Sequence, residues 1–324
     1  MKELIIDKND SGQRLDRFLK KYLSKAPNSF IYKMIRKKNI KLNNKKASPE
    51  TTIIEGDTIQ LYLADETIEK FREQIKVEKS HTSLNIIYED KNIIIINKPV
   101  GVLSHSANKD YGNNIVDSMI HYLCQKGEYN PRIEKTFTPA ICNRLDRNTS
   151  GIIIGAKNYP SLKVINEAIK QRNINKYYKT IVEGVIKKDM IVEGFLSKDG
   201  ELNKVEITDR ERDDSKRIFT GIKVLAISNQ YSLLEIELIT GRTHQIRAHL
   251  ASLGHPVIGD VKYGNKNTNK YFKEKYNLQS QFLHGHRIAF TEIDKSLEYL
   301  KGKEFIAKAG GKFIQIEKEL FEQL

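Results

Sequence analysis

The chain of 324 residues is poor in cysteine, and Cys124 and Cys142 are the only two. Their scarcity excludes a disulfide framework and a zinc site built from four cysteines. No apolar run approaches the roughly 18 residues that a membrane-spanning helix requires, and the first residues lack the apolar stretch of a secretory signal peptide. These absences predict a soluble protein of a reducing compartment, so we expect it in the cytoplasm, without membrane contact.

The sequence also lacks the motifs of the common cofactor-dependent and metal-dependent enzymes. No GxxxxGK[ST] loop is present, and no GxGxxG follows a predicted strand, which argues against phosphotransferases and against a fold that binds a nucleotide-type methyl donor. The HExxH motif of zinc proteases is absent as well. The pairs His244/His249 and His284/His286 have spacings at which zinc could bind, but lone histidines are mostly structural. We therefore expect no metal ion.

Acidic residues are scarce at the N-terminal end. The whole chain has a formal net charge of +14, and residues 1–50 hold 14 basic side chains against 5 acidic ones. The stretch Lys25–Lys46 has eight basic residues and no acidic one. Release of counterions from a nucleic-acid backbone favours binding to such a cluster. A solvated helix face would have the same composition, and the charge alone does not separate the two interpretations.

The first 63 residues have the pattern of a small α/β unit. Apolar residues recur at the spacing of a helix face from Leu15 to Tyr22, and a second apolar stripe follows Pro27. Short strands are expected at 40–47 and 58–63. We expect a compact unit over residues 1–63, followed by a charged, partly helical linker at 64–83. The other face of the second helix carries Lys33, Arg36, Lys37 and Lys38.

Residues 84–324 have the pattern of one larger domain in which strands alternate with helices. Runs rich in β-branched residues and bounded by turn residues predict strands at NIIIIN, GIIIGAK, YYKTIVEG, YSLLEIELI and FIAK. Helices are expected near Asn113–Cys124, Ser161–Arg172 and Thr243–Leu253. No segment repeats at a fixed period. The pattern predicts a large mixed α+β domain.

Three segments of this domain carry candidate functional residues. In the first, Arg144, Asp146 and Arg147 lie in a polar turn before a strongly apolar strand, where two cations would keep the carboxylate ionised. A surface ion pair that closes a loop is the alternative. In the second, strand alternation separates Tyr177 from Tyr178, so one of the two tyrosines faces the core or a cleft.

The third segment, LITGRTHQIRAHLASLG, predicts a helix that begins beside a turn. Thr243 is expected to cap the helix, and Gly254 is expected to end it. Arg242 and Arg247 are placed near the start of the helix, where backbone N–H groups already favour an anion. That anion could be a phosphate or the carboxylate of Asp146.

Together these segments resemble the RluA family of pseudouridine synthases, most of all its RluC type. The family's Arg-Leu-Asp motif corresponds to Arg144–Asp146, and its TGRTHQIR motif is complete. Asn143 stands where the family usually has histidine. Residues 14–63 resemble the alpha-L RNA-binding module. Further matches to family motifs lie at Glu89-Asp90, Lys98–Gly101, Thr149–Gly151, Lys176–Tyr178 and Gly184.

The resemblance implies an enzyme that isomerises uridine to pseudouridine in large-subunit ribosomal RNA, with no cofactor because the reaction needs neither redox change nor energy input. It implies that Asp146 is the catalytic carboxylate, that Tyr178 stacks on the target uracil, and that Arg247 pairs with Asp146. It also implies a mixed, mainly antiparallel sheet behind a small α/β RNA-binding domain. Contacts to RNA are expected from Arg144, Arg147, Arg242, Lys33, Arg36, Lys37 and Lys38.

The expected partner is large-subunit ribosomal RNA, free or within a ribosome assembly intermediate, and we expect a monomer. Two other classes are compatible with the basic module. A non-catalytic assembly factor does not explain why Asp146, Tyr178 and Arg247 occur together. A methyltransferase requires a glycine-rich motif for its methyl donor, which the sequence lacks.

Overall fold

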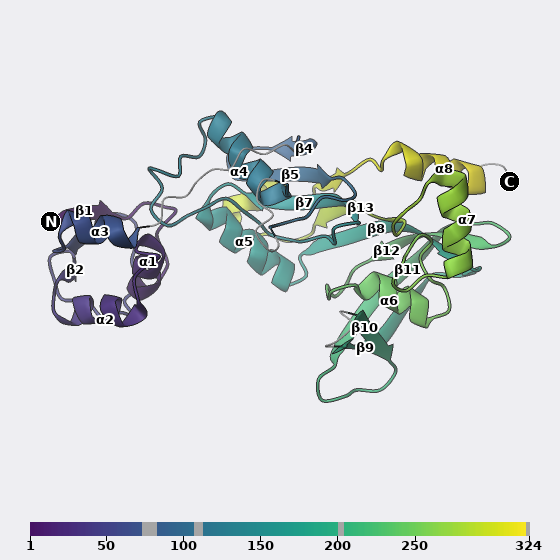
Figure 1. Ribbon diagram of the computed structural model, residues 1–324, viewed down its shortest axis with the longest axis horizontal. Helices are drawn as coiled ribbons and strands as arrows, with labels where there is room; N and C mark the ends of the chain where they lie inside the picture. The colour runs from purple at the N-terminus through teal and green to yellow at the C-terminus, as the bar shows by residue number, and fades with distance from the viewer. Residues whose placement is uncertain (73–82, 107–112, 200–203, 322–324) are drawn as a thin grey trace.

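The N-terminal unit combines helices with a three-stranded antiparallel sheet of order β1–β3–β2, and it lies at one end of the molecule in Figure 1. The computed structural model describes residues 1–72, 83–106, 113–199 and 204–321. The apolar stripes of the two predicted helices meet the sheet in one core. The elements of this unit are β1 (Lys2–Ile5), α1 (Leu15–Tyr22), α2 (Asn28–Arg36), β2 (Ile40–Leu42), β3 (Thr58–Leu61) and α3 (Asp65–Phe71).

Helix α3 belongs to the core of the N-terminal unit although it lies in the segment expected to be a linker. Its Ile68 is 2% exposed and is buried in the same cluster as Leu15 and Phe18, and Phe71 packs against Phe30. The compact part of this unit therefore extends to Phe71. The rest of the expected linker lies mostly at residues 73–82, outside the described residues.

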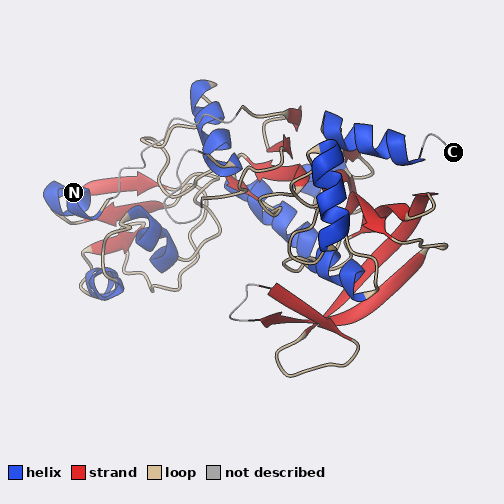
Figure 2. Ribbon diagram, turned by 45° about the vertical axis from the view of Figure 1, so that its right-hand side comes forward, coloured by secondary structure: helices blue, strands red, loops and turns tan. Residues whose placement is uncertain are grey.

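The larger body is built on an eleven-stranded sheet, which confirms the predicted α+β class (Figure 2). The main path of the sheet is β10–β9–β11–β12–β8–β13–β7–β5–β4, with β14 on β13 and β6 on β7. The strands are β4 (Ile86–Glu89), β5 (Ile93–Lys98), β6 (Ala140–Ile141), β7 (Ser150–Ala156), β8 (Ile174–Glu183), β9 (Met190–Asp199), β10 (Lys204–Thr208), β11 (Lys216–Ile227), β12 (Tyr231–Glu237), β13 (Leu283–Phe290) and β14 (Glu304–Ile306).

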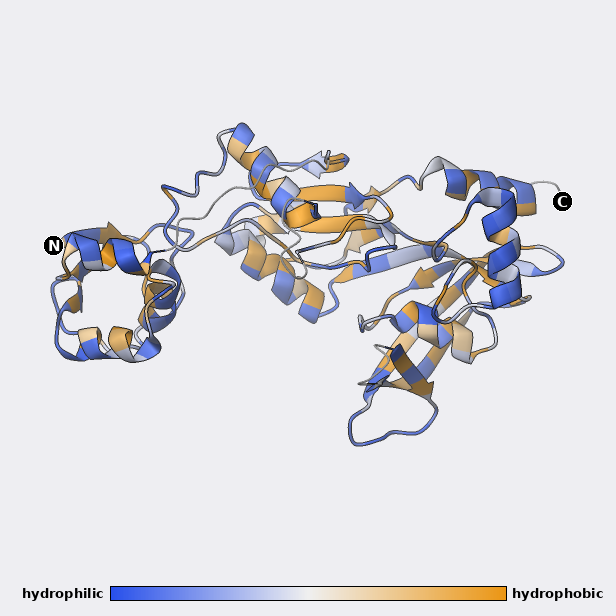
Figure 3. Ribbon diagram, viewed as in Figure 1, coloured by the Kyte–Doolittle hydropathy of each residue, from blue (hydrophilic) through white to orange (hydrophobic). Residues whose placement is uncertain are grey.

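Both faces of the sheet are covered by helices near β5 and β7, the strands that Figure 3 shows as the most hydrophobic. Alternating isoleucines divide between the two faces: Ile94 and Ile96 join the core that contains Met119, whereas Ile93 and Ile95 join the core that contains Ile165. The helices of the body are α4 (Ile115–Gln125), α5 (Tyr159–Lys170), α6 (Gln245–Ser252), α7 (Lys266–Tyr276), α8 (Gly311–Phe321) and the 3₁₀ helix η1 (Lys295–Leu300). No helix of the described residues is both long and apolar enough to cross a membrane.

The sheet has two halves that meet where β7 pairs with β13, and we call this pairing the glycine seam. Among the described strands, β13 and β7 form the only parallel pair, and their register places Gly285 opposite Gly151. The backbones approach so closely that a Cβ on Gly151 would lie 2.3 Å from the carbonyl oxygen of Gly285. Gly151 also has φ +121°, a conformation that side chains disfavour. Two glycines therefore permit the pairing that joins the halves of the sheet.

The N-terminal unit contacts the larger body through polar groups. The Asn9 side chain accepts a hydrogen bond from the backbone N–H of Tyr159 (3.2 Å), and the hydroxyl of Thr136 donates to the buried Asp10 (2.6 Å). The Gln13 amide donates to the hydroxyl of Thr136 (3.1 Å). These contacts hold the loop between β1 and α1 against the start of α5 and against the segment between α4 and β6.

Candidate active site

The sequence-predicted residues Arg144, Asp146, Tyr178, Arg242 and Arg247 all line one cavity of about 510 Å³. The loop between β6 and β7, the middle of β8 and the start of α6 form its walls. Pockets of this size hold small molecules or single bases. Segments that lie up to about a hundred residues apart in sequence are thus brought together.

Asp146 lies in a loop that backbone contacts hold in place. The hydroxyl of Ser104 donates to the carbonyl of Leu145 (2.7 Å), and the N–H of Leu145 donates back to Ser104 (3.0 Å). The N–H of Thr149 donates to the backbone carbonyl of Asp146 (3.1 Å). The Asp146 side chain is 31% exposed, so its carboxylate faces the cavity.

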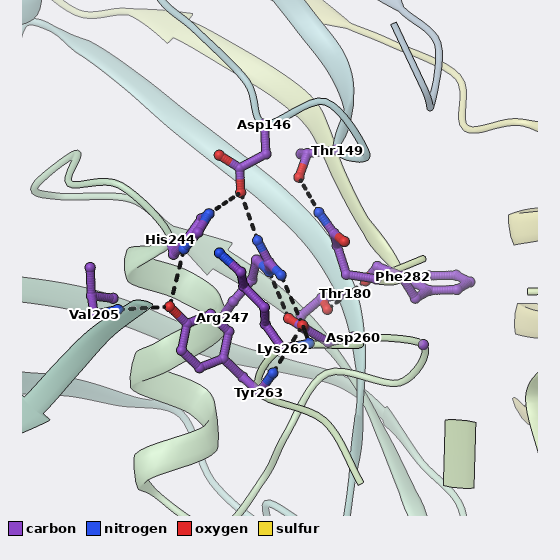
Figure 4. Close-up of polar contacts among 12 residues, drawn as sticks. Asp146, Thr149, Thr180, Val205, His244, Arg247, Asp260, Lys262, Tyr263 and Phe282 are labelled. Atoms are coloured by element: carbon purple, nitrogen blue, oxygen red, sulfur yellow. Dashed lines mark hydrogen bonds and ion pairs between the residues drawn. The ribbon is translucent and has the colours of Figure 1, made fainter. Parts of the chain in front are cut away.

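Arg247 joins Asp146 to a second, deeper carboxylate (Figure 4). Its Nη1 donates to Asp146 (3.0 Å), while its Nε and Nη2 donate to the two oxygens of Asp260 (2.6 and 2.8 Å). Burial opposes ionisation of Asp260, but the hydrogen bonds from Arg247 hold the pKa of its carboxyl below the ordinary value. Asp260 therefore fixes the guanidinium, and the guanidinium orients Asp146. The predicted pairing of Arg247 with Asp146 is present in the structure.

A histidine and a tyrosine extend this network on the other side of Asp146. Nε2 of His244 lies 3.8 Å from the Asp146 carboxylate, and Nδ1 lies 3.1 Å from the hydroxyl of Tyr263. The backbone N–H of Val205 donates to the same hydroxyl (2.9 Å), which ties β10 to the site. Burial lowers the pKa of His244, the nearby Asp146 partly opposing this shift. Burial thus favours the neutral form of the imidazole.

The start of α6 corrects one expectation. The helix begins at Gln245, and its N-cap is His244 rather than Thr243. His244 has φ +55°, in the left-handed region, and its side chain makes no capping hydrogen bond because the imidazole turns into the cavity. Gly254, at φ +82°, follows the last turn as predicted.

Tyr178 is the tyrosine that faces the cavity. It is 6% exposed, and burial together with the Asp146 charge raises the pKa of its hydroxyl. No hydrogen bond of this hydroxyl is found among the described residues. Tyr177 points to the other face of β8, where the Arg287 guanidinium lies 3.7 Å from its ring centroid. Gly285 makes room for the Tyr178 ring, since a Cβ there would lie 3.3 Å from the ring.

Lys98, in the segment matched to a family motif, is a structural cation beneath the site. Its side chain is fully buried, and its ammonium donates to the carbonyls of Pro99 (3.0 Å), Val102 (2.7 Å) and Arg147 (3.0 Å). Burial lowers its pKa to about 7, an effect that the Asp146 charge partly offsets. The three hydrogen bonds connect the loop after β5 to the loop that carries Asp146.

The other predicted RNA-contacting residues lie in three places. Arg144 and Arg242 are exposed at the cavity, and no ion pair of either with Asp146 is found among the described residues. Arg147 is exposed outside the cavity wall and donates from Nε to the Gly101 carbonyl (3.1 Å). The remaining four are all exposed at or just beyond the C-terminal part of α2 in the N-terminal unit: Lys33, Arg36, Lys37 and Lys38.

Asn143 and the histidines have structural partners. The Asn143 amide donates to the carbonyl of Ile152 (3.0 Å) and accepts from the N–H of Ile154 (2.8 Å), so it extends the edge pairing of β7. His249, His284 and His286 bond to Thr220, Ser150 and Glu235 respectively. Among the described residues there is no group of three or more side chains suited to hold a metal ion.

Sequence reasoning missed roles for His244, Asp260 and Tyr263. All three lie within or shortly after the TGRTHQIR segment, so the sequence motif already points to this part of the chain. The roles of His244 and Tyr263 could not be predicted, because they depend on contacts to Asp146 and Val205, which lie at least 58 residues away. The role of Asp260 depends on its hydrogen bonds with Arg247, which form only in the folded chain.

Comparisons with known proteins agree with this geometry. A family model described as RNA pseudouridylate synthase matches residues 92–252. An uncharacterized RNA pseudouridine synthase of Mycoplasma capricolum is 32% identical over 310 residues, covering 94% of this chain and 97% of the relative. Ribosomal large subunit pseudouridine synthase C of Rickettsia bellii is 34% identical over 292 residues, with 87% and 90% covered.

A solved structure, human RNA pseudouridylate synthase domain containing 4, is similar with a TM-score of 0.57 and 23% identity. The similarity covers 72% of this chain and 92% of the human chain. It agrees with the predicted mixed, mainly antiparallel sheet, and it bears on the fold alone.

Proposed function

Because this chain belongs to the RNA pseudouridylate synthases, isomerases that convert uridine to pseudouridine in RNA, we propose that it modifies large-subunit ribosomal RNA and that Asp146 is its essential carboxylate. The observation that carries this proposal is the position of Asp146, which faces the cavity and is held by Arg247. The ribosomal target is supported by relatives named ribosomal large subunit pseudouridine synthase C.

The reaction sets clear demands on the site. The bond between ribose C1′ and uracil N1 breaks, the base turns, and C1′ rejoins the base at C5, while the C5 proton is lost and N1 gains a proton. A carboxylate beside the sugar and the base is the group that assists these steps. Arg247 orients Asp146 through the hydrogen bond from its Nη1 and gives the carboxylate a cationic partner in a partly desolvated pocket, where an unpaired charge would cost several kcal/mol.

Tyr178 and Arg144 have complementary roles in this proposal. The target nucleotide has to leave its stack to reach Asp146, at a cost of a few kcal/mol, and single-stranded or bulged RNA lowers this cost. The buried ring of Tyr178 provides a surface on which the uracil stacks, and its hydroxyl assists removal of the C5 proton. Arg144, exposed at the rim of the cavity, fills the vacated space or holds flanking phosphates.

The N-terminal unit provides affinity in this proposal. The basic group Lys33, Arg36, Lys37 and Lys38 is exposed, as phosphate-binding side chains need to be. We propose that residues 1–63, with α3 packed on them, bind ribosomal RNA, free or in an assembly intermediate, and that the enzyme acts as a cytoplasmic monomer.

Two experiments test the proposal. Mapping pseudouridines in ribosomal RNA from cells that lack the protein should reveal one or more large-subunit positions that remain uridine. With purified protein, Asp146→Asn should abolish tritium release from RNA labelled at C5 of uridine while RNA binding persists. The control Asp213→Asn, at an exposed residue outside the cavity, should retain activity. Turnover in Asp146→Asn would overturn the catalytic assignment, and an unchanged rRNA map would overturn the ribosomal target.

A further inference from the structure

The charges that line the cavity do not balance. Asp146 is the only carboxylate of the described cavity wall, whereas four cationic side chains line it: Arg144, Lys176, Arg242 and Arg247. Arg247 is fully engaged, because it bonds to Asp146 and Asp260. The other three cations face the cavity without a carboxylate partner there. Of these three, Arg144 and Arg242 are exposed to solvent, and Lys176 is partly buried.

Lys176 lies on β8, two residues before Tyr178, so strand alternation directs both side chains to the same face. Its ammonium passes over the turn that precedes α6: a Cβ on Gly241 would lie 3.8 Å from Nζ. Among the described residues, no hydrogen bond or ion pair of this ammonium is found. Burial accordingly lowers the pKa of Lys176, and no neighbouring charge offsets it.

Two buried lysines of this protein, in contrast, have defined partners for their ammonium groups. Lys98 donates to three carbonyls, and Lys157 bonds to Glu89 (2.8 Å) and to the carbonyl of Asp90 (2.7 Å). An ammonium that is removed from water requires such partners. Lys176 is partly buried, lines the cavity and has no such partner among the described residues, so we expect its partner to arrive with the substrate.

We propose that Lys176 binds a backbone phosphate next to the target uridine, so that β8 supplies a phosphate subsite beside the base-binding tyrosine. The inference rests on the proposed function only in that RNA enters the Asp146 cavity. Uracil is neutral and cannot balance the charge of Lys176, whereas each nucleotide brings one phosphodiester anion. The absence of a side chain at Gly241 leaves the ammonium accessible from the side where the exposed Arg242 marks the path of the RNA backbone.

The test uses the salt dependence of binding. Removal of one phosphate contact to a single strand lowers the slope of log K against log salt by about 0.7, so affinity at about 0.1 M salt falls about fivefold while affinities near 1 M converge. We would measure binding of a short single-stranded RNA with one uridine to Lys176→Met, with Asp146→Asn in the background to prevent turnover. The matched control is Lys179→Met, on the other face of β8, where Nζ pairs with Glu317 (2.5 Å).

The expected result is the reduced slope for Lys176→Met and an unchanged slope for Lys179→Met. An uncharged methylphosphonate linkage on the 5′ or 3′ side of the uridine should weaken binding of the RNA to the protein that retains Lys176. The same linkage should leave binding to Lys176→Met unchanged, because the phosphate contact is already lost in this variant. Lys176→Met should also melt at an equal or higher temperature, because a partly buried charge without a partner is removed. Lys176→Gln provides the same comparison if the methionine variant does not fold.

An unchanged salt slope, or equal sensitivity of both proteins to the neutral linkages, would overturn the phosphate assignment. A fall in kcat on large-subunit rRNA without a rise in KM would do the same, since it would mean that Lys176 acts on the base. These readouts are independent of the catalytic assignment, which fails only if Asp146→Asn turns over.

Discussion

The basic side chains of α2 and the two buried cations of the active site, Arg247 and Lys98, lie in opposite surroundings. Lys33 and Arg36 are exposed, so water and salt screen their charges and each is replaceable by its neighbours. Arg247 is 5% exposed and Lys98 is fully buried, and each has defined partners at fixed distances. The basic group on α2 is therefore defined by its amount of charge, and the active-site cations are defined by their geometry. Substitutions should therefore have graded effects in the first region and abrupt effects in the second.

The largest effect is expected for Arg247→Met. The change leaves Asp146 and Asp260 without their common cation, and breaking a buried ion pair costs about 3–5 kcal/mol. We expect turnover to fall by about 10²-fold or more, as for loss of a preorganised electrostatic contact. Tritium release and urea unfolding measure the two quantities. A variant with near-normal turnover would show that the cavity tolerates charge loss as α2 does.

The next effect concerns the basic group on α2. Replacing Lys33, Arg36, Lys37 and Lys38 together by glutamine should reduce the salt slope of RNA binding by about 3 and weaken binding by about 10²- to 10³-fold at low salt. Each single substitution should give roughly a quarter of the slope change, and stability should stay within about 0.5 kcal/mol. Filter binding across a salt series checks this. Loss concentrated in one residue would contradict the comparison.

Low pH should destabilise the larger body more than the N-terminal unit, because residues 1–72 contain no histidine. Burial lowers the pKa of His244, His249, His284 and His286, that of His284 to about 4. The unfolded chain binds these protons near pH 6.5 and the folded chain does not, so the larger body loses stability as pH falls from about 6.5 to about 4. The lowered pKa of His284 alone corresponds to a loss of about 3 kcal/mol in the free energy of unfolding across this pH range.

Hydrogen exchange followed peptide by peptide measures this difference. Peptides of the larger body should lose protection across that pH window, while those of the N-terminal unit should not. Burial raises the pKa of Asp10 in that unit, and a raised carboxyl pKa favours the folded state as pH falls. Equal loss of protection in both regions would mean that they unfold together.

The smallest effect is expected at the contact between the two regions. Asn9→Ala removes the acceptor for the N–H of Tyr159 and the weak hydrogen bond to Glu134 (3.4 Å). Water can replace the lost partner of the Tyr159 N–H and of the Glu134 carboxylate, so the free energy of unfolding should fall by less than about 1 kcal/mol. Thermal unfolding checks the value. A larger change would show that the regions depend on each other for folding.

The fold was predictable where local pattern and tertiary burial agree. The β-branched runs that became β5, β7 and β8 are buried, and the stripes of α1 and α2 meet in one core. The strands β9 and β10 escaped prediction because their polar and apolar residues mix on a projecting hairpin (Figure 1). The cap of α6 was wrong because contacts of His244 across the cavity override the local capping preference of Thr243.

The site residues that lie in recognisable sequence motifs could be predicted. Asp146, Tyr178 and Arg247 lie in segments with recognisable spacing, and the structure brings all three to one cavity. The partners Asp260 and Tyr263 could not be identified from the sequence, and Lys176, although it lies in a matched motif, could not be seen to lack a carboxylate partner. Their significance depends on which groups are near them and which are absent, and only the folded chain specifies that.

The glycine seam between β7 and β13 has a consequence for enzyme evolution and engineering. Asp146 belongs to the half of the sheet that begins with β7, whereas Tyr178 and Arg247 belong to the half that includes β8, β11 and β12. The distance between the halves is set at Gly151 and Gly285, where no side chain intervenes. A single methyl group at Gly151 would act as a spacer that moves the carboxylate away from its arginine. Mutational tolerance should therefore be low at Gly151 as well, although this position bears no functional group.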